Sequence, residues 1–171
     1  MSKQAAPIET ERKYLIKMPD VQALEKLPGC VATRISQTYL MSEEGVTERV
    51  RKRVYPDQTV YTHTRKRRIS PMSSIEEERE ISREEYRLLK QRRDPDKNKI
   101  KKWRYAIPYA SHTLEIDIYP FWQKQAVLEI ELESESDIPA LPAYIQILRE
   151  VTGDKRYSNN AMSRKVPRED E

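Results

Sequence analysis

The first residues whose types and spacing could do chemistry are Glu9, Glu11 and Lys13, which occupy alternate positions near the start of the chain. Side chains of a β-strand alternate between its two faces, so these three charges would share one face of a strand over residues 8–16. Such a face can simply be solvated. It can also form one side of a site for a metal ion and a polyanion, because carboxylates bind hard cations and ammonium groups bind phosphate oxygens.

Later segments repeat this pattern of charges spaced two residues apart. The acidic sets are Glu76, Glu78 and Glu80; Glu115 and Asp117; and Glu129 and Glu131. The basic sets are Arg49, Arg51 and Arg53; Lys66; and Lys102 and Arg104. Like charges on one face repel, and most of these segments carry charges of one sign on that face. A solvated face therefore explains the pattern poorly. If about eight such strands close into a barrel, the charges can line its lumen, with a carboxylate side and a cationic side.

Alternation and turn residues predict the elements that would position these charges. Strands are expected over residues 8–16, 35–41, 46–55, 59–67, 75–81, 99–109, 112–119 and 126–134. The charge density of 75–81 also suits a helix, but Ser82 has the features of an N-cap, with Glu85 completing a capping box for a helix over 83–93. That start favours a strand before it. Further helices are expected over 20–27, capped by Asp20, and over 141–151, ending before Gly153.

Composition limits the class of protein. The 171 residues suit a single domain over 1–171, with a folded core over about 8–164 and loose tails at 1–6 and 167–171. The net charge of +4 comes from interleaved signs, which argues against a nucleic-acid partner. The single cysteine, Cys30, excludes an internal disulfide and a cysteine zinc site, and two histidines cannot form a histidine-rich metal site. No apolar run approaches the roughly 20 residues needed to span a membrane, and residues 1–7 lack the apolar core of a signal peptide, so we expect a cytoplasmic protein with no membrane partner.

The order of the charged segments resembles the CYTH superfamily, also called triphosphate tunnel metalloenzymes. The resemblance covers about residues 8–164. The matching motifs are ExExK at 9–13, QxYL at 37–40, RxR at 49–51, TxK at 64–66, ExExE at 76–80, KxRY at 102–105, ExD at 115–117, ExExE at 129–133, and a segment at 151–159 similar to the closing segment of bacterial members.

The resemblance implies an α+β fold built on a closed eight-stranded antiparallel β-barrel, or tunnel, with a charged lumen and helices packed outside. It also implies hydrolysis of the terminal phosphate of a triphosphate, or cyclisation of ATP, with Mg²⁺ or Mn²⁺. The metal ligands carried over are Glu9, Glu11, Glu129 and Glu131, with Asp117 and Glu78 assisting. The phosphate ligands carried over are Lys13, Arg49, Arg51, Lys66, Lys102 and Arg104. The candidate catalytic residues are Glu78, which would orient the attacking water, Tyr39, which stands where small bacterial members carry a tyrosine linked to substrate choice, and Lys66.

We therefore predict a metal-dependent triphosphatase. Inorganic triphosphate is the leading substrate, because the sequence shows no obvious pair of lumen-facing aromatic residues that could stack a nucleobase or thiazole. Thiamine triphosphatase and adenylate cyclase are the enzymatic alternatives. A polyphosphate- or nucleotide-binding module is the non-enzymatic one. The only partner expected is the small triphosphate, with a homodimer as an open alternative.

A few residues lie outside these motifs. Arg53 shares the lumen parity of Arg49 and Arg51, whereas Arg65 and Arg67 point outward. These three and Arg68 are expected to form a solvated basic rim, with the steering of polyanions into the lumen as an open alternative. By the same parity His63 is predicted to lie on the surface, and Trp103 to lie in the apolar core. Cys30 is expected to serve packing.

Overall fold

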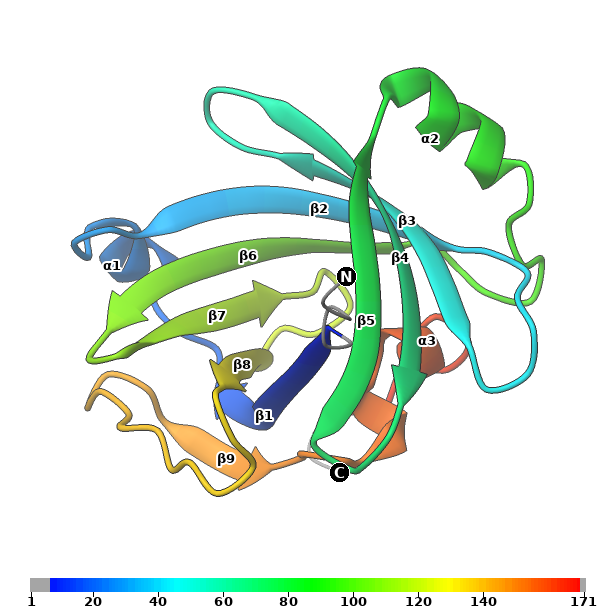
Figure 1. Ribbon diagram of the computed structural model, residues 1–171. Coiled ribbons are helices and arrows are strands. Elements are labelled where there is room, and N and C mark those ends of the chain that lie inside the picture. The colour runs from blue at the N-terminus through cyan, green and yellow to red at the C-terminus, as the bar shows by residue number, and fades with distance from the viewer. Residues whose placement is uncertain (1–6, 170–171) are drawn as a thin grey trace, which may run out of the picture.

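The computed structural model describes residues 7–169 (Figure 1). Its strands are β1 (Ile8–Lys17), β2 (Val31–Tyr39), β3 (Thr47–Val54), β4 (Thr59–Arg68), β5 (Ser73–Ile81), β6 (Ile100–Tyr109), β7 (His112–Ile118), β8 (Gln125–Leu132) and β9 (Ile147–Glu150). Its helices are α1 (Val21–Glu25), α2 (Arg83–Lys90), α3 (Asn159–Met162) and the 3₁₀ turn η1 (Lys155–Tyr157). Each of the eight predicted strands is therefore present, with ends shifted by a few residues.

The strands form one antiparallel sheet that closes on itself. Their order is β5-β4-β3-β2-β6-β7-β8-β1-β9, and β1 also pairs with β5. Strand β1 pairs with β8 over Thr10–Lys17, with β5 only over Ile8–Thr10, and with β9 from Tyr14 onward. The predicted eight-stranded antiparallel barrel is confirmed, with β9 as an extra strand.

The apolar core lies largely outside the barrel wall. Leu128 and Ile130 on β8 point outward and are fully buried, packed with Leu24 of α1 and Ile145 of the β8–β9 connection. Because their neighbour Glu129 points the opposite way, the charged face of the strand is left to the lumen. At one end the lumen is filled by apolar side chains, namely Leu15, Val127, Tyr119, Trp122, Tyr157 and Met162.

Two helix starts follow the local sequence as predicted. The Asp20 carboxylate accepts hydrogen bonds from the backbone N–H groups of Gln22 and Ala23, and α1 begins at once after it. The Ser82 hydroxyl accepts from the N–H of Glu85, which starts α2 and leaves β5 as a strand before it. The capping box is incomplete, however, since the Glu85 carboxylate pairs with Arg79 at 2.7 Å.

The helix predicted over 141–151 is wrong. Ile147–Glu150 forms β9, which continues the pairing of β1 where β5 has diverged from it. A bare strand edge leaves N–H and C=O groups without partners, and this segment satisfies them. That tertiary hydrogen bonding outweighs the helical spacing of its apolar residues.

Two burial predictions are also wrong. His63, expected on the surface, is 9% exposed, and its Nε2 lies 2.7 Å from a carboxylate oxygen of Glu48. Trp103, expected in the core, is 44% exposed, with the Arg34 guanidinium over its ring. Both side chains point out of the barrel, so their burial depends on which outer segment covers them. Alternation alone does not carry this information.

Cys30 is half-buried and packs against the outer core, as expected. The predicted tail at 1–6 lies outside the described residues, as do the last two residues, 170–171, of the predicted tail at 167–171. Within the described part of the second tail, Pro167 and Glu169 accept hydrogen bonds from the Trp122 side chain and the N–H groups of Gln123 and Lys124. No helix between residues 7 and 169 has the length and apolarity needed to cross a membrane.

Candidate active site

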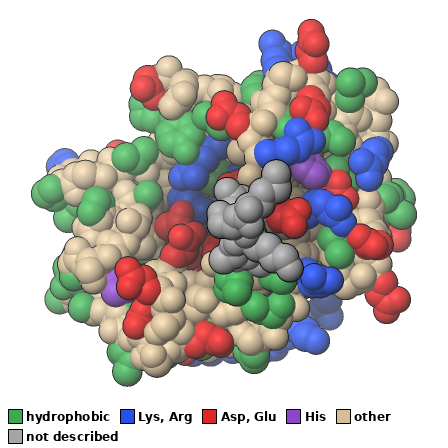
Figure 2. Space-filling model, in the orientation of Figure 1, with side chains coloured by type: hydrophobic (Ala, Val, Ile, Leu, Met, Phe, Trp, Pro, Cys, Tyr) green, Lys and Arg blue, Asp and Glu red, His purple; other side chains and the backbone are tan. Residues whose placement is uncertain are grey.

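The barrel encloses a cavity of about 610 Å³ whose lining is dominated by charge. Figure 2 shows basic side chains above acidic ones in the hollow beside the grey residues. The acidic lining residues are Glu9, Glu11, Glu76, Glu78, Glu115, Glu129 and Glu131. The basic lining residues are Lys13, Arg49, Arg51, Arg53, Lys66, Arg68, Arg104 and Lys155. Of the predicted site residues, Tyr39 also lines the cavity, whereas Lys102 and Asp117 do not.

The acidic wall, formed by Glu9, Glu11, Glu129 and Glu131, is built by strand register. Glu11 lies directly opposite Glu131, and Glu129 lies between Lys13 on β1 and Glu115 on β7. Directly opposed like charges destabilise a sheet, so this arrangement needs cations. Lys13 supplies one, with its Nζ 3.4 Å from a Glu129 oxygen.

Proton affinity in the acidic wall shows the same need for cations. Burial, a hydrogen bond that protonated Glu9 donates to Glu76, and the charge of Glu76 raise the pKa of Glu9 to about 10. Burial and the charge of Glu129 raise the pKa of Glu11 to about 7. For Glu76, burial alone would raise the pKa, but its hydrogen bond with Glu9 and the charge of Arg49 hold it below its usual value. The Glu9–Glu11 part of the wall is therefore short of positive charge, whereas at Glu129 the charges of Lys13 and Arg104 outweigh burial and hold the pKa below its usual value.

The donor set of the acidic wall fits a hard divalent cation. Its donor atoms are all carboxylate oxygens, which Mg²⁺ and Mn²⁺ prefer. A bound cation would lower the raised pKa values of Glu9 and Glu11, because nearby positive charge stabilises the ionised carboxylates. As the side chains lie, no three acidic, histidine or cysteine groups within residues 7–169 converge closely enough to hold a metal ion. A bound cation would therefore require these carboxylates to move toward one another.

The basic wall, formed by Arg49, Arg51 and Lys66, comes from β3 and β4. Arg49 and Lys66 each lie 3.7 Å from a carboxylate oxygen of Glu76. Arg51 is 9% exposed, and burial together with the charges of Arg49 and Arg104 lowers its pKa to about 9. Cations that repel one another in a buried cavity favour an anion between them. The register that brings them together is Arg49 opposite Thr64 and Thr47 opposite Lys66.

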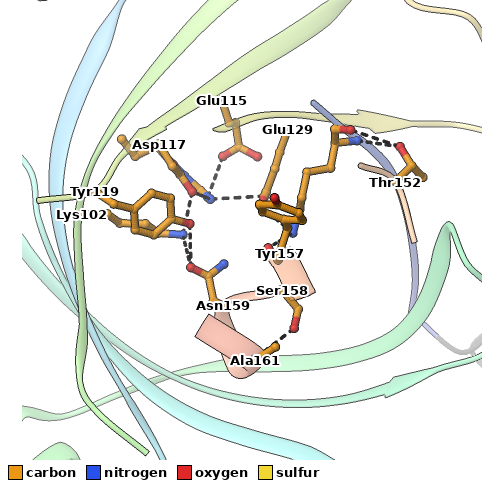
Figure 3. A network of polar contacts seen from close by, with 12 residues as sticks. Lys102, Glu115, Asp117, Tyr119, Glu129, Thr152, Tyr157, Ser158, Asn159 and Ala161 are labelled. Atoms are coloured by element: carbon orange, nitrogen blue, oxygen red, sulfur yellow. Dashed lines mark hydrogen bonds and ion pairs between the residues drawn. The ribbon is translucent and has the colours of Figure 1, made fainter. Parts of the chain in front are cut away.

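Lys102 and Asp117 belong to a network behind the cavity (Figure 3). Lys102 Nζ lies 2.6 Å from Asp117 Oδ2, and both side chains are fully buried. Arg104 donates from Nε to Asp117 Oδ1 at 2.7 Å and from Nη2 to Oδ2 at 2.9 Å, and also pairs with Glu115 and Glu129. Both Asp117 oxygens are thus engaged. The structure brings Arg104 to the cavity but holds Lys102 and Asp117 away from it.

Sequence reasoning gave no role to the C-terminal part of the cavity lining. Lys155, Ser158, Asn159 and Asn160, in and around η1 and α3, all line it. Asn159 Oδ1 accepts from the Tyr119 hydroxyl at 2.7 Å and from Lys102 at 3.4 Å, which anchors α3 to the network of Figure 3. The polar run at 158–160 was the available signal. Nothing in strand alternation places a helical segment inside a barrel.

No family model matches the chain, and no curated protein matches it. Among solved structures, the inorganic triphosphatase NE1496 is 26% identical, covers 94% of this chain and 97% of its own, and superposes with a TM-score of 0.56. A conserved hypothetical protein from Pyrococcus furiosus is 21% identical, covers 75% of this chain and 80% of its own, and has a TM-score of 0.57. PH1819 from Pyrococcus horikoshii OT3 is 18% identical, covers 73% of this chain and 80% of its own, and has a TM-score of 0.54.

The two Pyrococcus proteins share the fold with this chain, and at their identities they carry no further argument. NE1496 matches over nearly the full length of both chains. Its match agrees with the ordered charged strands and with the closure of β1 on β5 around the charged cavity. The chain therefore has the tunnel fold that its resemblance to the CYTH superfamily implies, and it is similar over nearly its full length to the inorganic triphosphatase NE1496.

Proposed function

We propose that the protein hydrolyses the terminal phosphate of a triphosphate, with inorganic triphosphate as the substrate. The observation that carries the proposal is the single cavity in which the acidic wall and the basic wall lie together. A metal–triphosphate complex needs both, because carboxylates bind the metal while Arg and Lys bind the phosphate oxygens. The similarity to the inorganic triphosphatase NE1496 supports the same activity.

The roles of the cations follow from the chemistry of phosphoryl transfer. The transition state spreads negative charge over the oxygens of the transferred group, so catalysis depends on alignment and charge neutralisation. Five cations line the cavity and bind these oxygens, namely Lys13, Arg49, Arg51, Lys66 and Arg104. Each must exchange any carboxylate contact for phosphate. Lys102 acts from behind, by holding Asp117 and Asn159 in place.

The metal would be held by Glu9, Glu11, Glu129 and Glu131. When bound, Mg²⁺ or Mn²⁺ supplies a Lewis acid that neutralises phosphate oxygens. Glu78 holds the attacking water, because it lines the cavity and one of its oxygens already accepts from the Thr64 hydroxyl at 3.0 Å, which fixes the carboxylate. Asp117 keeps Arg104 in position and is not needed as a direct ligand.

Inorganic triphosphate is favoured over larger substrates by the lining of the cavity. Tyr39 is the one aromatic residue among its described lining residues, so no aromatic pair is available to enclose a nucleobase or thiazole. The Tyr39 ring is itself held in place. Its hydroxyl accepts from Gln37 at 3.0 Å, and Lys97 Nζ lies 5.5 Å from the ring centre. A fixed ring beside the phosphate ligands restricts what the triphosphate can carry.

A phosphate-release assay tests the proposal. Inorganic triphosphate, thiamine triphosphate and ATP are compared with Mg²⁺, with Mn²⁺ and with chelator. We expect the largest kcat/KM for inorganic triphosphate and no release with chelator. Tight binding without release from any substrate would instead favour a binding module, and formation of cyclic AMP would favour a cyclase. The homodimer, the cytoplasmic location and the absence of nucleic-acid and membrane partners stay predictions.

A further inference from the structure

Gln37 is a fully buried amide that holds a cation of the cavity. It lies on β2 directly opposite Arg51 on β3. Its Oε1 accepts from Arg51 Nε at 3.2 Å and from Nη2 at 3.0 Å, and its Nε2 donates to the Tyr39 hydroxyl at 3.0 Å. Because arginine has donors and no acceptor, the amide atom that faces Arg51 must be the oxygen. The orientation of the amide is therefore fixed by its neighbours.

Arg51 differs from the other predicted phosphate ligands in its partner. Five of the six contact a carboxylate: Lys13 contacts Glu129, Arg49 and Lys66 contact Glu76, Lys102 contacts Asp117, and Arg104 contacts Glu115, Asp117 and Glu129. For Arg51, no carboxylate of residues 7–169 lies within 4.0 Å of its nitrogens, and a neutral amide takes that place. Buried charges are normally paired, because an unpaired one is costly. The exception lies on the lining of the cavity proposed to bind a polyanion.

We propose that Gln37 is a positioning residue whose neutrality sets the anion affinity of the tunnel, because it holds Arg51 in place without neutralising it. The inference rests on the proposed triphosphate site. The other cations exchange a carboxylate for phosphate when the substrate binds, and that exchange limits the gain in binding free energy. Arg51 makes no such exchange. A carboxylate of the same shape at position 37 would give Arg51 a permanent partner inside the protein.

Gln37→Glu tests this directly, because it changes charge at nearly constant shape. The new carboxylate can accept from Arg51 as the amide does, and the Tyr39 hydroxyl can donate to it. We expect the affinity for inorganic triphosphate with Mg²⁺, measured by titration calorimetry, to fall about tenfold or more. KM should rise in step, with kcat changed less. The thermal unfolding midpoint without ligand should be equal to or above that of the wild type, since the buried cation gains a counter-ion.

Two further variants separate charge from shape and position. Ser36→Glu adds the same charge one residue away on the outer face of β2, opposite Lys52 and Lys101, and should leave affinity and midpoint unchanged. Gln37→Met removes the hydrogen bonds to Arg51 without adding charge, and should weaken binding less than Gln37→Glu does. An equal or larger loss in Gln37→Met would overturn the proposal, because neutrality would then not be the determinant.

The outcomes for Gln37→Glu itself are equally decisive. Wild-type affinity would overturn the inference even if hydrolysis is intact. A midpoint below that of the wild type would overturn it too, because the carboxylate would then not be paired with Arg51. A wild-type protein that binds inorganic triphosphate but releases no phosphate would refute the proposed hydrolysis alone, since the comparison of affinities needs no turnover.

Discussion

Lys102 and Asp117 form an ion pair with 2.6 Å between Nζ and Oδ2, and neither side chain has any exposed surface. The pair links β6 to β7 behind the cavity, and Arg104 completes it from the cavity side. Although the motif pattern presents these residues as a phosphate ligand and a metal ligand, their positions indicate that they support Arg104 and α3. That difference can be measured.

Asp117→Asn should act on stability first. The change leaves Lys102 and Arg104 buried with one fewer counter-ion, and removing one partner of a buried pair costs about 3–5 kcal/mol. Urea denaturation followed by circular dichroism measures this loss. A variant with wild-type stability and no turnover would show instead that Asp117 binds the metal directly.

The acidic wall should be essential for turnover, whereas two of its members, Glu9 and Glu11, should be dispensable for folding. Glu9→Gln, Glu11→Gln and Glu129→Gln each remove a proposed metal ligand, and each should lower kcat/KM by at least about 10²-fold, as expected when charge stabilisation is lost. For Glu9→Gln and Glu11→Gln the unfolding midpoint should not fall, since burial already raises the pKa of both groups. Phosphate release at several Mg²⁺ concentrations measures the effect. Wild-type rates in all three variants would show that the wall does not bind the metal.

The two faces of β8 should respond in opposite ways. Ile130 is fully buried in the outer core, so Ile130→Glu places an unpaired charge there and should unfold the protein or lower its midpoint strongly. Glu131 lines the cavity, so Glu131→Ala should lower activity at little cost in stability. Thermal unfolding and phosphate release, measured on both variants, give the comparison. The reverse result would contradict the assignment of inner and outer faces.

The His63–Glu48 pair provides a contrast outside the tunnel. Both side chains are 11% exposed and their contact is 2.7 Å, with an Arg92 nitrogen 3.9 Å from the same Glu48 oxygen. His63→Ala leaves a buried carboxylate with one weaker partner and should cost about 1–3 kcal/mol. Since neither residue lines the main cavity, kcat and KM should stay at wild-type values under native conditions. A change in KM without a change in stability would mean that this pair is linked to the substrate site.

The sequence by itself determined which face of each strand carries charge. Side chains alternate with period two whatever the strand contacts, so Glu9, Glu11 and Lys13 could be assigned to one face before any pairing was known. Helix starts at Asp20 and Ser82 were equally accessible, because a cap bonds to N–H groups two or three residues along the chain. The order of the charged motifs supported a family resemblance, and that resemblance implied the closed barrel, which the strand pairing confirms.

Only the tertiary structure decided what each face meets. Parity places Lys102 and Lys66 both in the lumen, but depth along the barrel depends on strand stagger, which buries the first and brings the second to the cavity. His63 and Trp103 both point out of the barrel but differ in burial, because the outer segments cover the first side chain and leave much of the second exposed. Residues 147–150, expected to be helical, form β9 because they pair with the free edge of β1. The contact of Gln37 with Arg51 depends on the register of β2 against β3, since a neutral residue gives no sign in the sequence of the charge that it holds.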